Sequence, residues 1–128
     1  KSGLLTKLAT LELASNSKQA ARDFARAAFS LDPTNGNALF IIAEAYAGSR
    51  IGETFENQTV YWVVVDYLVR ARNTDPTLKD QVDERIGIYS RLFPTKEEAF
   101  FRSLVEEGTP YQVGGWINES TTIRFRKQ

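Results

Sequence analysis

Two stretches of the sequence share one pattern: "AARDFARAAFSLDPTN" at residues 20–35 and "VVVDYLVRARNTDPTL" at residues 63–78. In each, an amphipathic helical pattern runs into an Asp-Pro pair. Proline cannot continue a helix, because its ring clashes with the preceding turn and it lacks an N–H. The same residue is well tolerated near the first turn of a following helix. Each stretch therefore predicts the end of one helix and the start of another.

The two prolines, Pro33 and Pro76, lie 43 residues apart. A tetratricopeptide repeat, built from two helices, is 34 residues long, which leaves nine residues to place. They fall in "GSRIGETFEN" at residues 48–57, a polar segment with two glycines between two helical patterns. We therefore expect a long loop inside the second helical pair.

The segment "NALFIIAEAYA" at residues 37–47, followed by a helix ending in "RARNTDP", resembles a tetratricopeptide repeat. Small and large apolar residues stand where that family places its packing positions: Leu5, Leu8, Ala9, Ala21, Phe24, Ala28, Pro33, Ala38, Leu39, Ile42, Ala43 and Tyr46. The resemblance implies one domain, residues 1–128, that forms an α-α superhelix. Its parts would be a first repeat at 2–35, a second at 36–78 and a degenerate third pair at 79–108.

Three further segments occur together: "VYW" at 60–62, "FPTKEEAFF" at 93–101 and "VGGWINESTT" at 113–122. In combination they resemble a family of uncharacterised tetratricopeptide-repeat proteins of Bacteroides-type bacteria, over about residues 36–126. Members of that family often carry cysteines in the long loop and just before the hairpin tryptophan. This chain has no cysteine, and Gly115 precedes Trp116. If those cysteines pair in relatives, the long loop and the hairpin are neighbours.

The expected fold is mainly α, with a C-terminal β-hairpin cap at residues 109–128. Apolar residues alternate with polar ones at Val113, Ile117, Thr121, Ile123 and Phe125, the period of a half-buried strand. The turn falls at Asn118-Glu119 or in a longer loop. A lone hairpin is barely stable in water, so we expect it to rest on the last helical pair. Helices are expected at 3–15, 18–31, 36–48, 58–73, 77–91 and 95–107, the last with a Thr95/Glu98 capping box and Gly108 at its end.

Composition excludes several functions. The chain has no Cys and no His, which removes Cys/His zinc sites, Cys–His dyads and Ser–His–Asp triads. Sixteen basic residues balance sixteen acidic ones, so no overall field attracts nucleic acid. The basic-aromatic tail "RFRKQ" is too short to change this and is expected to be a solvated strand end. No apolar run reaches membrane length. We expect no enzyme activity and no cofactor or metal.

The family resemblance also implies a concave groove lined by the first helix of each pair. Thr6, Thr10, Leu13, Ala47 and Gly87 occupy groove positions, and the partner-binding residues are expected to be Asn37, Phe40, Glu44, Asp80 and Asp83. Phe40 is either an exposed anchor for a partner or a core residue under the neighbouring helix. The Lys/Asn clamp that holds a peptide carboxylate in a common subtype is absent. The acidic residues favour a basic or polar partner, or form a solvated helix face.

Two functions remain open. The first is a non-enzymatic scaffold that binds a protein or peptide, or that packs on other repeats of a longer chain, since Leu4, Leu8 and Leu11 share a face. The alternative is an envelope-associated protein that binds carbohydrate or a small molecule on an aromatic edge, or whose rings simply form the cap's core; this edge comprises Tyr61, Trp62, Tyr111 and Trp116. The compartment is open. A signal peptide before Lys1 would indicate the bacterial periplasm or cell envelope.

Overall fold

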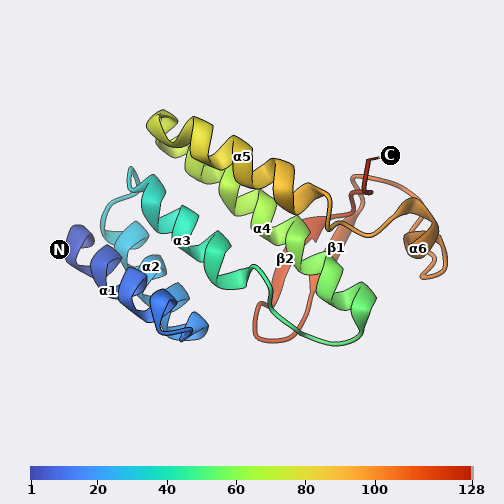
Figure 1. The fold of residues 1–128 in the computed structure, drawn as a ribbon, viewed down its shortest axis with the longest axis horizontal. Coiled ribbons are helices and arrows are strands. Elements are labelled where there is room, and N and C mark those ends of the chain that lie inside the picture. The colour runs from blue at the N-terminus through green and yellow to red at the C-terminus, as the bar shows by residue number, and fades with distance from the viewer. Residues whose placement is uncertain (128) are drawn as a thin grey trace.

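The computed structural model describes residues 1–127, which form a mainly helical fold with one small antiparallel sheet (Figure 1). Six α-helices and one 3-10 turn together make the structure 62% helical. The α-helices are α1 (Ser2–Ala14), α2 (Lys18–Leu31), α3 (Gly36–Tyr46), α4 (Thr54–Thr74), α5 (Lys79–Ser90) and α6 (Lys96–Phe100). A 3-10 turn at Pro76–Leu78 precedes α5, and strands β1 (Pro110–Val113) and β2 (Glu119–Thr122) follow α6. Within residues 1–127, no helix combines the length and apolar character needed to cross a membrane.

Both Asp-Pro pairs end a helix, as the sequence predicts. Asp32 and Asp75 adopt extended backbone angles at the ends of α2 and α4. Each aspartate side chain then accepts hydrogen bonds from the backbone N–H and the hydroxyl of the threonine two residues later. These contacts turn the chain back, since an Asp side chain bonded two residues on mimics a backbone turn. Asn35 then caps α3 by accepting from the N–H of Ala38 at 3.1 Å.

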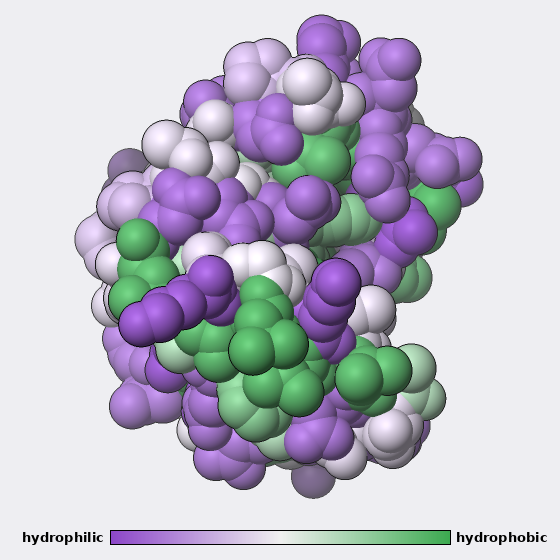
Figure 2. Space-filling view, turned by 90° about the vertical axis from the view of Figure 1, so that its left-hand side faces the viewer, coloured by the Kyte–Doolittle hydropathy of each residue, from purple (hydrophilic) through white to green (hydrophobic). Residues whose placement is uncertain are grey.

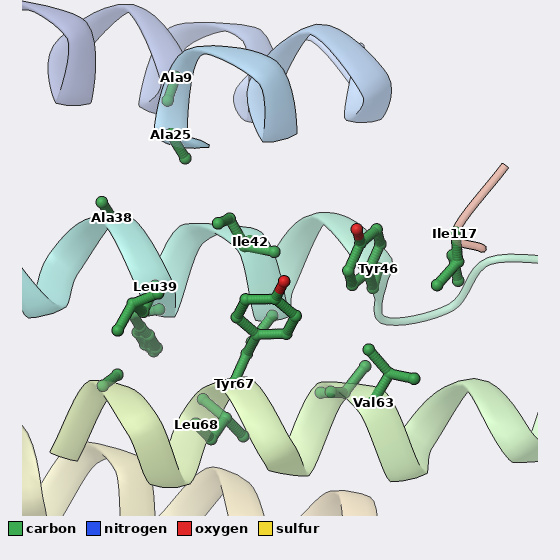
Figure 3. Close-up of a cluster of buried hydrophobic side chains, with 14 of the residues drawn as sticks. Ala9, Ala25, Ala38, Leu39, Ile42, Tyr46, Val63, Tyr67, Leu68 and Ile117 are labelled. Atoms are coloured by element: carbon green, nitrogen blue, oxygen red, sulfur yellow. The ribbon is translucent and has the colours of Figure 1, made fainter. Parts of the chain in front are cut away.

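Successive helices from α1 to α5 pack against one another in chain order. Several alanines on α1, α2 and α3 are fully buried, so these helices approach closely; Ala9, Ala25 and Ala38 lie along this seam in Figure 3. Between α3 and α4 the core changes to larger side chains, among them Leu39 and Leu68 (Figure 3). The core is therefore made of small side chains near the N-terminus and of larger ones around α4.

Gly36 shows how close one of these approaches is. A Cβ at this position would stand 2.7 Å from the Cβ of Asp75 and 2.9 Å from the carbonyl oxygen of Ala71. Only glycine lets the start of α3 meet the end of α4 at this distance. The two Asp-Pro turns are thereby linked in space as well as in pattern.

Two predicted boundaries are wrong. The helix expected at 58–73 begins at Thr54, so the loop expected at 48–57 occupies only residues 47–53. The helix expected at 95–107 ends at Phe100, although its Thr95/Glu98 capping box is present. The chain turns back because Ser103 takes a positive φ of 61° and the N–H of Leu104 bonds to the carbonyl of Ala99 at 2.9 Å. Gly108, expected at the helix end, lies in a later turn and donates to the carbonyl of Ile123.

The hairpin alternates as predicted but lies in a different place. Pro110 pairs with Thr122 and Val113 with Glu119, and residues 114–118 form a five-residue connection in which Asn118 has a φ of 46°. Both strands contact α4, behind which they lie in Figure 1. The hairpin therefore packs mainly against α4 rather than against the expected last helical pair.

Candidate functional site

An open groove of about 420 Å³ lies on one side of the helical layer. Its walls come from α1, α3 and α5. The lining residues are Thr6, Thr10, Asn37, Phe40, Ile41, Glu44, Gln81 and Arg85. The groove is the candidate functional site because it is concave, polar and contributed by three helices.

One ion pair crosses the groove from α3 to α5. The Glu44 carboxylate accepts hydrogen bonds from the Arg85 guanidinium and, at 3.0 Å, from the Tyr89 hydroxyl. Burial, together with the negative charge of Glu44, raises the pKa of Tyr89 to about 12. Tyr89 is therefore a neutral donor at physiological pH. The charges of Glu44 and Arg85 offset each other, so the groove is polar without a strong net charge.

The hydroxyls on the α1 wall are engaged within the protein. Thr6 donates to the carbonyl of Ser2 and accepts from the Asn35 amide at 2.9 Å. Thr10 donates to the carbonyl of Thr6. The side-chain amides of Asn37 and Gln81, by contrast, make no hydrogen bond to any other residue in 1–127 and are exposed. They are the groups most available to a partner's backbone.

The structure brings together only part of the predicted binding set. Asn37, Phe40 and Glu44 line the groove, but Asp80 and Asp83 do not. Asp83 instead pairs with Arg72 of α4 and, at 2.8 Å, with Lys79, while Asp80 is exposed. The groove therefore lacks the acidic bias expected from the sequence.

Phe40 is a core residue rather than an exposed anchor. Its side chain is only 7% exposed, and the Arg85 guanidinium lies 5.5 Å above its ring. Of the two interpretations of Phe40, the structure supports packing under the neighbouring helix. Phe40 forms an apolar floor that a partner reaches only past Arg85.

The groove positions expected on α5 were Asp80, Asp83 and Gly87, but Gln81 and Arg85 line the groove instead. The face of α5 that meets the groove depends on how this helix packs against α4, which the repeat pattern does not give. Leu13 and Ala47 also lie outside the groove lining, and Gly87 lines a different cavity. The four-residue spacing of Gln81 and Arg85 is the only sequence signal that joins them.

The predicted aromatic edge does not exist as one surface. Trp62 is fully buried, donates its indole N–H to the carbonyl of Arg124 at 2.7 Å and packs edge-on against Tyr111. Tyr61 stacks on Tyr89, and Trp116 packs against Tyr46. The four rings belong to three separate contacts, so they cannot stack together on a sugar. Trp62 is therefore closed to a ligand, whereas Trp116 is only partly buried, and binding of carbohydrate or a small molecule stays a prediction.

A polar cluster seals the face opposite the groove. Glu119 of β2 accepts from the hydroxyls of Tyr46 at 2.5 Å and Tyr67 at 2.8 Å, and from Arg26 at 3.1 Å. Burial, and next the bonds to Glu119, raise the pKa of both tyrosines. We call these four residues the Glu119 cluster. It ties the hairpin to α2, α3 and α4, and no local sequence signal could have found contacts that span 52 to 93 positions.

The hairpin loop also meets the loop between α3 and α4, as the family resemblance implies. Gly115 has a φ of 63°, and a Cβ there would stand 2.7 Å from the Ile51 side chain. The backbone N–H of Ile51 in turn donates to the Asn57 side chain at 2.7 Å. The two loops are therefore in direct contact without a disulfide.

Within residues 1–127, no group of three or more acidic side chains is placed to hold a metal ion. No family model matches the chain, and no curated protein or solved structure matches it either. The comparisons therefore identify no family, and the groove geometry is the basis for a functional proposal.

Proposed function

We propose that this chain is a non-enzymatic, tetratricopeptide-type scaffold that binds an extended segment of a partner protein in the groove. The observation that carries this proposal is the convergence of α1, α3 and α5 on one open concavity while the hairpin covers the other side. The two Asp-Pro turns and the alanine seams support the repeat interpretation. Membership in the Bacteroides-type family is part of the proposal and rests on the sequence resemblance.

The polar groups of the groove restrict the kind of segment that can bind there. Asn37 and Gln81 present amides that can each donate to and accept from a peptide backbone. Glu44 and Arg85 already pair with each other, so a strongly charged segment would have to break that contact. The favoured partner is therefore a polar, extended segment recognised mainly through its backbone. A free carboxylate at the end of a peptide has no dedicated clamp here.

Site-specific photo-crosslinking tests this proposal. A photoreactive phenylalanine analogue at Asn37 or Gln81 should capture a partner from the native organism, and the same analogue at Asp80 should not. Asp80 is a matched control because it is exposed on the same helix but outside the groove. The captured segment, made as a synthetic peptide, should bind the wild-type chain and bind the double variant Asn37→Ala/Gln81→Ala more weakly. Equal binding by both proteins would overturn the groove assignment.

A second surface supports packing against another helical pair of a longer chain. Leu4 and Leu11 of α1 are each 64% exposed and Leu31 of α2 is 58% exposed. Figure 2 looks onto this end of the molecule, where apolar residues gather among polar ones. In a longer protein, Leu4→Gln/Leu11→Gln should lower the melting temperature, while in this chain alone it should not. A lower melting temperature in both proteins, or in neither of them, would contradict the proposal.

An envelope location belongs to the same proposal and depends on a signal peptide in the full-length protein. Cell fractionation of the native organism tests it directly. Recovery of the full-length protein from the cytoplasmic fraction alone would overturn it.

A further inference from the structure

We propose that the C-terminal end of α5 and the segment 124–127 form a second binding site, for a small amphiphilic anion. The ligand would be an apolar body that carries one carboxylate, sulfonate or phosphate. The site is a cavity of about 350 Å³, at the lower end of the range for small-molecule pockets. It is separate from the groove and does not depend on the proposed scaffold function.

The floor of this cavity is apolar. Phe93 is 6% exposed, and Phe125 is half-buried beside it. Gly87 leaves room at the α5 wall, since a Cβ there would meet no heavy atom within 4 Å. An apolar ring or chain entering the cavity would be removed from water against these side chains, which favours binding.

The rim is cationic. Four basic residues line the cavity: Arg91, Arg124, Arg126 and Lys127. Among the described residues that line it, none is acidic. Arg124 pairs with Asp66, so Arg91, Arg126 and Lys127 are the cations that raise the local concentration of anions, although the chain as a whole is neutral.

Two of the guanidinium groups are already oriented by the backbone. Arg91 donates its Nε to the carbonyl of Gly87 at 3.1 Å, and Arg126 donates its Nε to the carbonyl of Phe93 at 3.0 Å. Within residues 1–127, the terminal nitrogens of both groups have no protein acceptor. A guanidinium held in place loses less side-chain entropy when it binds a carboxylate or phosphate.

Arg124 is bonded within the protein instead of being free to bind an anion. It pairs with Asp66 at 2.9 Å, donates to the carbonyl of Trp62 at 2.8 Å and lies 5.6 Å above the Phe93 ring. These contacts fix the base of the tail on α4. The backbone N–H of Arg126 also donates to the carbonyl of Pro94 at 2.9 Å. These contacts hold the C-terminal segment in place as one wall of the cavity, whereas its sequence predicts a solvated strand end.

Three probes separate the two parts of the proposed ligand. 8-Anilinonaphthalene-1-sulfonate has an apolar body and one anion, N-phenyl-1-naphthylamine has the same body without the sulfonate, and inorganic phosphate has only the anion. In amide NMR titrations of uniformly ¹⁵N-labelled protein, the sulfonate should shift Gly87, Phe93 and Phe125. The uncharged analogue and phosphate should each bind this site at least about tenfold more weakly, because each lacks one of the two contacts.

Variants test the role of the rim. Arg91→Gln/Lys127→Gln should weaken sulfonate binding about tenfold and leave binding of N-phenyl-1-naphthylamine unchanged. These two side chains are exposed, so the fold should be retained, which far-UV circular dichroism checks. Arg102→Gln is the matched control, since it removes a cation outside this cavity and should leave the affinity unchanged.

A second apolar surface could also bind the naphthalene probes, and its contribution must be distinguished. Phe100, Phe101 and Val105 form an exposed apolar patch, with Phe101 84% exposed. The titrations are therefore repeated in a Phe101→Ser background, where shifts at Gly87 and Phe125 should persist. Shifts confined to residues 100–105 would overturn the proposal. Equal affinity for the charged and uncharged naphthalenes, or no effect of Arg91→Gln/Lys127→Gln, would also overturn it.

Discussion

Each side of the helical layer carries a glutamate that is bonded to arginine and tyrosine, but one side is an open groove and the other is covered. On the groove side, Glu44 joins Arg85 and Tyr89 but leaves an open concavity between the helices. On the other side, Glu119 joins Tyr46, Tyr67 and Arg26, and it arrives on a hairpin that covers the helices. The same carboxylate–tyrosine–arginine chemistry thus bridges two helices in one place and attaches a whole element in the other. We therefore expect the hairpin side to serve stability, and in the proposed function the groove side is the one left for a partner.

The strongest test of this comparison is Trp62→Ala on the hairpin side. Trp62 is fully buried and satisfies the carbonyl of Arg124, so its removal leaves a cavity and an unpaired acceptor. The free energy of unfolding should fall by about 3–5 kcal/mol. Urea denaturation followed by circular dichroism measures this. Phe101→Ala, which removes an 84% exposed ring, is the control and should change stability by less than about 0.5 kcal/mol.

The next test compares two adjacent glycines of the hairpin loop. Gly115→Ala places a Cβ against Ile51 at a residue with positive φ, so it should destabilise by about 2–4 kcal/mol. Gly114→Ala adds a Cβ that meets nothing within 4 Å, so its effect should be small. Thermal melts of the two variants measure the difference. Equal melting temperatures would mean that the two loops are not in contact.

Glu119→Gln tests the Glu119 cluster. The neutral amide cannot accept all the bonds that the carboxylate accepts, so we expect a loss of about 1–3 kcal/mol. A double-mutant cycle with Tyr67→Phe should show coupling of at least about 0.5 kcal/mol. Ser120→Ala on the outer face of the same strand is the control and should be nearly neutral. Additive effects of Glu119→Gln and Tyr67→Phe would argue against the cluster.

Alkaline titration compares the tyrosines of the two sides. Folding raises the pKa of Tyr46, Tyr67 and Tyr89, the last to about 12, whereas an unfolded tyrosine titrates near ~10. The unfolded chain therefore loses these protons first, and the stability that they contribute is present below pH ~10 and declines as pH rises above it. Absorbance at 295 nm should show the Tyr46→Phe variant missing the last tyrosine to ionise. In the Tyr89→Phe variant, a step near pH ~12 should be missing instead.

The smallest effect on stability is expected on the groove side. Asn37→Ala removes an exposed amide that makes no bond within residues 1–127, so stability should change by less than about 0.5 kcal/mol. The same substitution, combined with Gln81→Ala, should weaken partner binding. A large loss of stability would mean that the groove side is structural as well.

Sequence reasoning found five of the eight groove residues, and it missed Ile41, Gln81 and Arg85. Asn37, Phe40 and Glu44 follow directly from the start of α3, which Asn35 caps. The positions of Gln81 and Arg85 depend on how α5 packs against α4, and periodicity within one helix does not reveal that packing. Likewise, the short length of α6 depends on Ser103 adopting a positive φ, which a serine rarely does.

The sequence by itself determined the mainly helical class, the two helix ends at Asp-Pro, the capping box of α6 and the alternation of the hairpin. These features depend on residues that are close in the chain, where proline geometry and side-chain caps act locally. Tertiary structure alone decided which side the hairpin covers, which helix faces form the groove and where the basic tail comes to rest. Those outcomes depend on contacts such as Arg26 with Glu119 and Trp62 with Arg124, whose partners lie 93 and 62 positions apart. Their energy exists only once the whole chain has packed.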